Sequence, residues 1–220
     1  NVVTHKPISN RLLEGLTVID SIRENQVKSH LLAWSDKPTY RLMKDWMDEG
    51  VIGQLKEIHK WSVRPVWPQF PHAPIDPDRV PNGFNWQLWL GPEKDRPFSH
   101  QYTHIVFRGW YDFGGGSIAD MGHYSLWPLC LKFGIDTAPL SARAYGTTTS
   151  ITEKNVSRGE RNKVAFPYSC IVEFDFPEQK TLPPFKLYWY DGGMKPFAPD
   201  ELEMDGRDID DEGMMFVGDK

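Results

Sequence analysis

A carboxylate and an imidazole follow a run of three glycines near the middle of this 220-residue chain. Asp120 and His123 are three residues apart, and residues at that spacing share one face of a helix. The glycines, Gly114 to Gly116, permit a close backbone approach that side chains would block. A carboxylate that orients an imidazole raises its basicity, so the pair could take a proton from a hydroxyl group. The aromatic residues that precede the glycines, which fit a site for a polar organic molecule, are Trp110, Tyr111 and Phe113.

The segment that carries this pair has the pattern of a helix. Ser117 opens a run with apolar periodicity, and Pro128 either kinks the helix or restarts it. A purely structural interpretation is also open. An aspartate near a helix start is favoured by the helix dipole, and a histidine can be satisfied within a core.

The first fifty residues alternate between strand and helix patterns. A short strand ends just before Lys6. We then expect a helix from Ser9 to about Glu24, a strand over Val27–Trp34 and a helix over Pro38–Glu49. This order is typical of the last part of a doubly wound α/β sheet. One face of the first helix consists of the apolar residues Leu12, Leu16 and Ile19.

Lys6 stands directly after the first predicted strand. Ligands of open α/β sheets bind beyond the carboxyl ends of the strands, so the ammonium group can point into a cleft there. In that place it could donate a hydrogen bond to a reacting oxygen and stabilise developing negative charge. The alternative is a solvated lysine that precedes a proline.

After the first fifty residues the pattern changes, and beyond Gly134 the chain is predicted to turn to β. A strand over Leu55–Arg64 precedes an irregular segment, Pro65–Pro97, that holds eight prolines. Long segments of this kind are usually functional, and this one fits either a substrate lid or an arm that clasps a neighbouring subunit. Further strands are expected over Ser169–Phe176 and Lys186–Tyr190, and Asp200–Glu212 is expected to be a solvated loop.

Five residues are candidates to line a sugar pocket. Aromatic rings can stack on the faces of sugars, and arginine donates hydrogen bonds to hydroxyl groups. Buried tryptophan is also common in protein cores, so each of them has a structural alternative. The candidates are Arg64, Trp67, Arg108, Trp110 and Tyr111.

The two cysteines, Cys130 and Cys170, are typical of small core residues and do not form a disulfide framework. Cys170 also belongs to an alternating set in the predicted strand over Ser169–Phe176. The face that this set forms, which we expect to be buried against helices of the chain or a partner subunit, consists of Cys170, Val172, Phe174 and Phe176.

Composition argues against several classes of partner. A hydrophobic content of 40% and nine tryptophans supply a core, and no stretch approaches the roughly 20 apolar residues of a membrane helix. The formal net charge of −5 argues against a nucleic-acid partner, since phosphate binding needs clustered Lys and Arg. His100 and His104 are four apart but lack a third ligand, so we predict no metal site.

Four motifs stand in order along the chain: His5-Lys6-Pro7, the segment from Glu49 to Glu57, the glycine turn with its Asp120 helix, and Phe216-Val-Gly-Asp-Lys220. Together they resemble motifs of the Gfo/Idh/MocA family of nicotinamide-dependent sugar oxidoreductases. The sequence departs from the family pattern at two points. His5 stands where the family has Glu. Asp120 and His123 are three rather than four apart, and Tyr124 holds the fourth position.

The resemblance implies an α/β protein. Residues 1–50 would be a remnant of a Rossmann-type dinucleotide-binding domain. Residues 51–220 would be a substrate-binding and oligomerisation domain, a mostly antiparallel sheet with helices on one face. The resemblance also implies a homo-oligomer that packs through the open face of that sheet.

The same resemblance implies NAD or NADP as the cofactor of the full-length protein, contacted by Lys6 and Pro7. Gly114 to Ala119 formally fits G-x-G-x-x-A, but it does not follow a predicted strand, so we reject it as a pyrophosphate site. We therefore expect this chain to be a piece of a longer enzyme, without bound cofactor when alone.

The implied activity is oxidation or reduction of a hydroxyl group on a sugar, glycoside or cyclitol. Lys6, Asp120 and His123 would carry it, with either His123 or Tyr124 as the acid–base residue. Two alternatives remain open: an NAD-using glycosidase of the same family, and a non-catalytic binding or oligomerisation module. We expect a cytoplasmic location, with the natural N-terminus upstream of Asn1.

Overall fold

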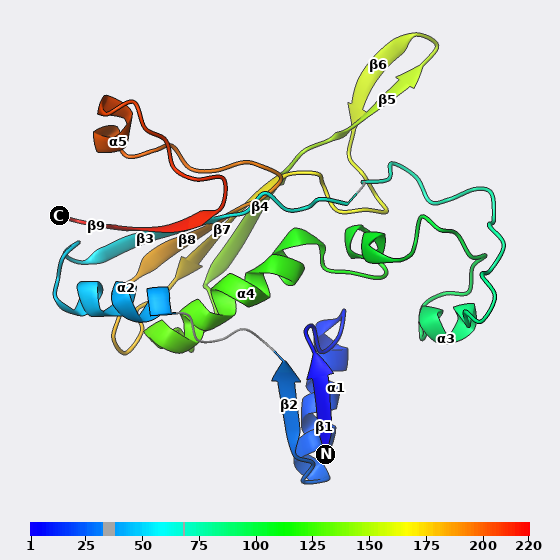
Figure 1. Ribbon diagram of the computed structural model, residues 1–220, viewed down its shortest axis with the longest axis horizontal. Helices are drawn as coiled ribbons and strands as arrows, with labels where there is room; N and C mark the ends of the chain where they lie inside the picture. Colours follow the sequence, from blue (N-terminus) through cyan, green and yellow to red (C-terminus); the bar gives the residue numbers. More distant parts are fainter. Residues whose placement is uncertain (33–37, 68) are drawn as a thin grey trace.

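The computed structural model describes residues 1–32, 38–67 and 69–220, and its main element is a five-stranded sheet (Figure 1). The strand order is β4-β7-β8-β3-β9. Neighbouring strands are antiparallel except β3 and β8, which are parallel. The sheet is therefore mostly antiparallel, as predicted. The strands are β3 (Leu55–Trp61), β4 (Ser141–Gly146), β7 (Cys170–Phe176), β8 (Phe185–Tyr190) and β9 (Gly213–Gly218).

Two helices, α2 (Pro38–Asp48) and α4 (Gly116–Phe133), cover one face of this sheet (Figure 1). Strand β8 shows why: Phe185, Leu187 and Trp189 are buried, whereas the residues between them are only partly buried. The predicted apolar face of β7 points the same way, because Phe174 and Phe176 pack against the buried cluster. The centre of that cluster consists of Ile58, Leu129, Phe133, Phe185 and Leu187.

Helix α4 runs without interruption through Pro128. Proline lacks the N–H that would bond to the carbonyl four residues earlier, which here belongs to Tyr124. Packing compensates, since Pro128 and Leu129 are fully buried, and the Tyr40 hydroxyl donates to the Ser125 carbonyl at 2.9 Å. The helix ends at Gly134, which has a left-handed conformation. None of the helices in the described parts of the chain is long and apolar enough to cross a membrane.

The N-terminal residues form a small β-α-β unit: β1 (Val2–His5), α1 (Leu12–Glu24) and β2 (Ser29–Leu32), with the two strands parallel. Helix α1 begins later than predicted. Ser9 does not cap it, because its hydroxyl donates to the Arg11 carbonyl instead of accepting from a helical N–H. The predicted strand extended to Trp34, which lies outside the described residues.

This unit contacts the remainder of the chain through polar groups. None of the residues of α1 is buried. Leu12 is 79% exposed, so the apolar face expected on that helix is open. Arg11 pairs with Glu93 at 2.5 Å, and Asn10 donates to the Asp112 carbonyl at 3.0 Å. The Lys6 contact with α4 adds to these ties.

The sequence predicts that Pro65–Pro97 is irregular, but the segment between β3 and α4 is partly helical. It contains the short helix α3 (Trp86–Leu90), which the Asn85 side chain caps by accepting from the Leu88 N–H at 2.9 Å. A 3₁₀ helix, η1 (Ile105–Gly109), follows. A second buried cluster of mostly aromatic residues holds the segment together: Trp86, Leu90, Phe98, Tyr102, Trp110 and Ala165.

Two further features lie at the edges of the fold. The hairpin of β5 (Thr149–Glu153) and β6 (Val156–Glu160) projects away from the sheet (Figure 1). The acidic stretch predicted as a loop begins with a five-residue helix, α5 (Asp200–Met204), which no buried residue anchors. Its first turn holds three acidic residues, Asp200, Glu201 and Glu203, and negative side chains are favoured at a helix N-terminus.

Candidate functional site

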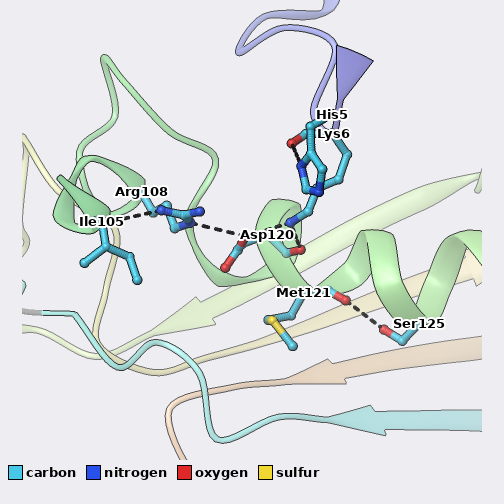
Figure 2. Close-up of polar contacts among 7 residues, drawn as sticks. All are labelled: His5, Lys6, Ile105, Arg108, Asp120, Met121 and Ser125. Carbon is cyan, nitrogen blue, oxygen red and sulfur yellow. Dashed lines mark hydrogen bonds and ion pairs between the residues drawn. The ribbon is translucent and has the colours of Figure 1, made fainter. Parts of the chain in front are cut away.

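Lys6 and Asp120 meet although 114 positions separate them (Figure 2). Lys6 follows β1, and its Nζ lies 2.6 Å from Oδ1 of Asp120; it also donates to the backbone carbonyl of Asp120. The side chains are 3% and 16% exposed. Two charged groups so far from water keep this arrangement only when they are paired, so the contact fixes the Lys6 ammonium against α4.

Tyr124, one turn after Asp120, flanks the same ammonium group. The Lys6 Nζ lies 4.2 Å from the centre of the Tyr124 ring, which is a cation–π distance. An ammonium group has three N–H donors, and Asp120 accepts two of them. One donor is left for another oxygen. The residue that takes the fourth position after Asp120 is thus in contact with the predicted catalytic lysine.

Arg108 is a second cation on the same carboxylate. Its Nε lies 3.3 Å from Oδ1 of Asp120, and its Nη1 donates to the Ile105 carbonyl at 3.3 Å (Figure 2). The sequence had indicated Arg108 as a sugar-pocket residue, with no sign of this ion pair. The side chain is 30% exposed, so the guanidinium group is held by these two contacts and still reaches solvent.

The glycine turn explains how Arg108 reaches Asp120. A Cβ on Gly114 would lie 2.6 Å from the Arg108 Cα, which is closer than real Cβ atoms come. Gly116 has φ +66°, and a Cβ there would lie 2.9 Å from the Phe166 ring. A side chain at Gly114 would separate the backbone of η1 from the start of α4, and one at Gly116 would clash with the Phe166 ring. The close approach predicted for the glycines is present, and it is a contact between two segments of the chain, the glycine turn and the backbone of η1.

His123 does not form the predicted pair with Asp120. The carboxylate is held by Lys6 and Arg108, and the His123 ring stacks on Trp127 with centroids 6.1 Å apart. Burial lowers the pKa of His123, and the charges of Lys6 and His5 lower it further. The imidazole is therefore less basic than usual, the reverse of our expectation from the sequence. Its Nε2 is buried and has no hydrogen-bond partner within the described residues.

A cavity of about 210 Å³ opens beside the Lys6–Asp120 pair. It lies between the N-terminal β-α-β unit and the start of α4. Its walls combine charged groups with two aromatic rings and the backbone of the glycine turn. The residues that line it include Lys6, Pro7, Phe107, Arg108, Phe113, Gly114–Gly116 and Asp120.

The other predicted pocket residues lie elsewhere. Trp67 and Trp110 are each 3% exposed, and Trp110 stacks on Phe70 and donates to the Gln101 carbonyl at 2.7 Å. Tyr111 packs edge-on against Phe166, with the ring centroids 4.5 Å apart. The Arg64 carbonyl accepts from the Gly192 N–H at 2.5 Å. None of these four lines the cavity, whereas Arg108 does.

Sequence reasoning missed Asp191, a buried carboxylate near the start of α4. It is 3% exposed and accepts from the Cys170 N–H at 2.6 Å and from the Trp189 indole at 3.0 Å. Burial raises its pKa, although the donors of Trp189 and Cys170 act in the opposite direction. Asp191 therefore links the end of β8 to the start of β7. The Asp-Gly-Gly sequence had indicated only the end of a strand.

Metal ligands are not gathered here: the described residues contain no group of three or more His, Cys, Asp or Glu side chains that could hold an ion. His104 precedes the 3₁₀ helix η1 and so does not share an α-helical face with His100. Both cysteines are free and partly buried.

Comparison with known families gives one match. Residues 51–168, more than half of the chain, match the family described as "Oxidoreductase family, C-terminal alpha/beta domain", which is of the Gfo/Idh/MocA type. Among curated proteins, none matches the chain.

Solved structures of two dehydrogenases share the fold. The WlbA dehydrogenase of Bordetella pertussis, solved with NADH and UDP-GlcNAcA, is 14% identical with a TM-score of 0.53. The WlbA dehydrogenase of Chromobacterium violaceum, solved with the same two ligands, is 15% identical with a TM-score of 0.51. Each comparison covers 100% of this chain but 49% and 46% of those chains. The chain thus spans less than half the length of these relatives.

Proposed function

This chain belongs to the Gfo/Idh/MocA oxidoreductase family, and we propose that it handles the substrate in an NAD(P)-dependent oxidation or reduction of a hydroxyl group on a sugar, glycoside or cyclitol. The contact between Lys6 and Asp120 carries this proposal. Local structure does not require residues so far apart to meet, whereas a shared active site does. The match from residue 51 supports a division into a dinucleotide-binding remnant, 1–50, and a substrate-binding domain, 51–220.

Lys6 is the residue that acts on the reacting oxygen. Its one uncommitted N–H donates to the substrate hydroxyl oxygen and stabilises the negative charge that develops when the proton leaves. Asp120 positions the ammonium through two hydrogen bonds. The contact with the Tyr124 ring restricts it from the other side.

The proton acceptor is either His123 or Tyr124. His123 is the better base at neutral pH, because its lowered pKa keeps the imidazole unprotonated and its Nε2 has no partner among the described residues. Tyr124 lies against the Lys6 ammonium, and its hydroxyl group is the alternative acceptor. Both side chains lie close to Lys6, although neither lines the cavity itself.

The nicotinamide cofactor, when bound, supplies the hydride acceptor or donor. Lys6 and Pro7 stand at the carboxyl end of β1, where cofactors of open α/β sheets bind. The pyrophosphate does not fit the residues present, because the turn from β1 to α1 contains no glycine and only Gly15 and Gly50 precede Gly53. We expect calorimetry to find no micromolar binding of NADH to these 220 residues alone.

The open face of the five-stranded sheet is the surface through which we expect copies of the chain to pack. Its centre holds the His59 ring, stacked on Tyr188 at 4.8 Å and hydrogen-bonded to the Tyr190 hydroxyl at 3.0 Å. Aromatic residues are enriched at protein interfaces, which supports this proposal.

The substrate-binding roles of Arg64, Trp67, Trp110 and Tyr111 stay predictions, and Arg108 is the one that lines the cavity.

Steady-state kinetics of the full-length protein with a panel of sugars and cyclitols tests the function. Lys6→Ala should lower turnover about 100-fold or more while the affinity for NADH stays largely intact. Lys28→Ala, which changes an exposed lysine just before β2, is the matched control and should behave as wild type. Unchanged turnover in Lys6→Ala would remove Lys6 from the mechanism. Transfer of hydride without net oxidation, together with cleavage of a glycoside, would favour the glycosidase alternative.

A further inference from the structure

The cavity beside Lys6 carries more positive than negative charge. Among the residues that line it, Lys6 and Arg108 are cations and Asp120 is the one carboxylate. Both cations share that single carboxylate, at 2.6 and 3.3 Å. Histidine can only add positive charge, so neither His5, which also lines the cavity, nor His123 offsets this balance. One positive charge on the wall is therefore not matched by a carboxylate among the lining residues.

That excess charge is on Arg108. Lys6 gives two donors to Asp120, and the proposed function assigns its third to the reacting oxygen. Arg108 has five N–H donors. Its Nη1 donates to the Ile105 carbonyl and its Nε faces Asp120, but its Nη2 has no hydrogen-bond partner among the described residues.

The guanidinium group of Arg108 is also held in a defined orientation. Its Cζ lies 4.7 Å from the centre of the Phe107 ring, so one of its faces is covered. Gly114 packs against its backbone, and Ile105 and Asp120 hold two of its nitrogens. A planar, restrained guanidinium with a free amino group matches an oxyanion better than it matches a neutral hydroxyl.

We propose that the substrate is an acidic sugar, and that its carboxylate or phosphate group binds Arg108 while its reacting hydroxyl binds Lys6. This rests on the proposed function and specifies the substrate class for the same site. The acidic group would neutralise the excess charge, and the separation of Lys6 and Arg108 by Asp120 would set the orientation of the ring. Arg108 is then a specificity residue.

Calorimetry on the full-length protein without cofactor tests the charge preference. The probes are matched pairs: D-glucuronate against D-glucose, D-galacturonate against D-galactose, and D-glucose 6-phosphate against D-glucose. In at least one pair the acid should bind tenfold or more tightly than its neutral partner, and added salt should reduce the difference. Arg108→Gln should weaken binding of the acid far more than binding of the neutral sugar and so abolish the difference, and Arg108→Lys should restore part of it.

Arg23→Gln is the matched control, because Arg23 is an exposed arginine on α1 outside the cavity, and it should not change any affinity. Equal binding of acids and neutral sugars, or no binding of any acid in the panel, would overturn the proposal. So would an equal loss for both members of a pair in Arg108→Gln. If NADH displaces the acid competitively, the anion site belongs to the cofactor and the proposal fails. Hydride transfer with a neutral sugar alone would reject the acidic substrate but retain the proposed function.

Discussion

Gly114 lies against the backbone of Arg108, where a Cβ would come within 2.6 Å of the Arg108 Cα. This contact brings η1 next to the first turn of α4, and the consequence is the 3.3 Å ion pair between Arg108 and Asp120. The glycine run therefore shapes the site through packing within the chain. A phosphate group is not needed to explain it.

Replacing Gly114 by alanine should force η1 and α4 apart. We expect a loss of about 1–3 kcal/mol in the free energy of unfolding, the usual cost of overpacking, measured by denaturant titration. Gly122→Ala is the matched control within α4, because a Cβ there meets only ordinary contacts at 3.4 Å or more. Alanine is the better helix former, so the control should be neutral or stabilising by up to about 1 kcal/mol. Equal effects of the two variants would contradict the packing role of Gly114.

The lowered pKa of His123 predicts a specific titration. Because the folded environment disfavours the charged imidazole, its proton is lost at a lower pH than in an unfolded chain, so the NMR midpoint should fall below 6.5. Burial is the largest cause and the Lys6 charge the next. Lys6→Met should thus raise the midpoint without bringing it fully to the ordinary value. His72, which lines a different cavity, is the internal reference and should not change. A midpoint that stays fixed in Lys6→Met would mean that Lys6 does not influence the ring.

Several parts of this arrangement follow from sequence patterns. The β-α-β-α order of the first fifty residues, the helix after the glycines and the alternating strand β7 all have clear periodicity. Helix α3 was not predicted because eight prolines dominate its segment, and the Asn85 cap acts over a single turn. Helix α5 was not predicted because a run of carboxylates is typical of a solvated loop. Acidic side chains also favour the start of a helix.

The pairing within the site was less accessible from the sequence. Spacing on a helix indicates that Asp120 and His123 share a side, but it does not reveal which other segment approaches that side. The carboxylate is held by Lys6 and Arg108, which come from two other parts of the chain. Asp191 shows the same limit, because its donors become neighbours only when β7 and β8 have paired.

Asp191→Asn should weaken the junction between β7 and β8. The amide that replaces the carboxylate places an N–H group against the Cys170 N–H or the Trp189 indole, and a buried donor left without an acceptor costs about 1–3 kcal/mol. Denaturant unfolding measures the loss, and near-UV circular dichroism reports the environment of Trp189. Asp200→Asn, an exposed carboxylate in α5, is the control and should stay within about 0.5 kcal/mol of wild type. A loss as small as that of the control would show that Asp191 does not hold this region together.

The Lys6–Asp120 pair should be coupled far more strongly than an ion pair on the surface. A double-mutant cycle with Lys6→Met, Asp120→Asn and the double variant, followed by denaturant unfolding, should give a coupling of about 1–3 kcal/mol, because both side chains are largely buried. Asp120→Asn should cost more than Lys6→Met, since it leaves two cations unpaired, whereas Asp120 keeps Arg108 when Lys6 is removed. Lys44 and Asp48 on α2 form the reference pair at 2.5 Å, and Asp48 is 62% exposed. Their coupling should be about 0.3–0.5 kcal/mol. If the two cycles gave the same coupling, the contact that joins the N-terminal unit to α4 would be no stronger than a surface pair, and the site could not rely on it to hold the Lys6 ammonium in place.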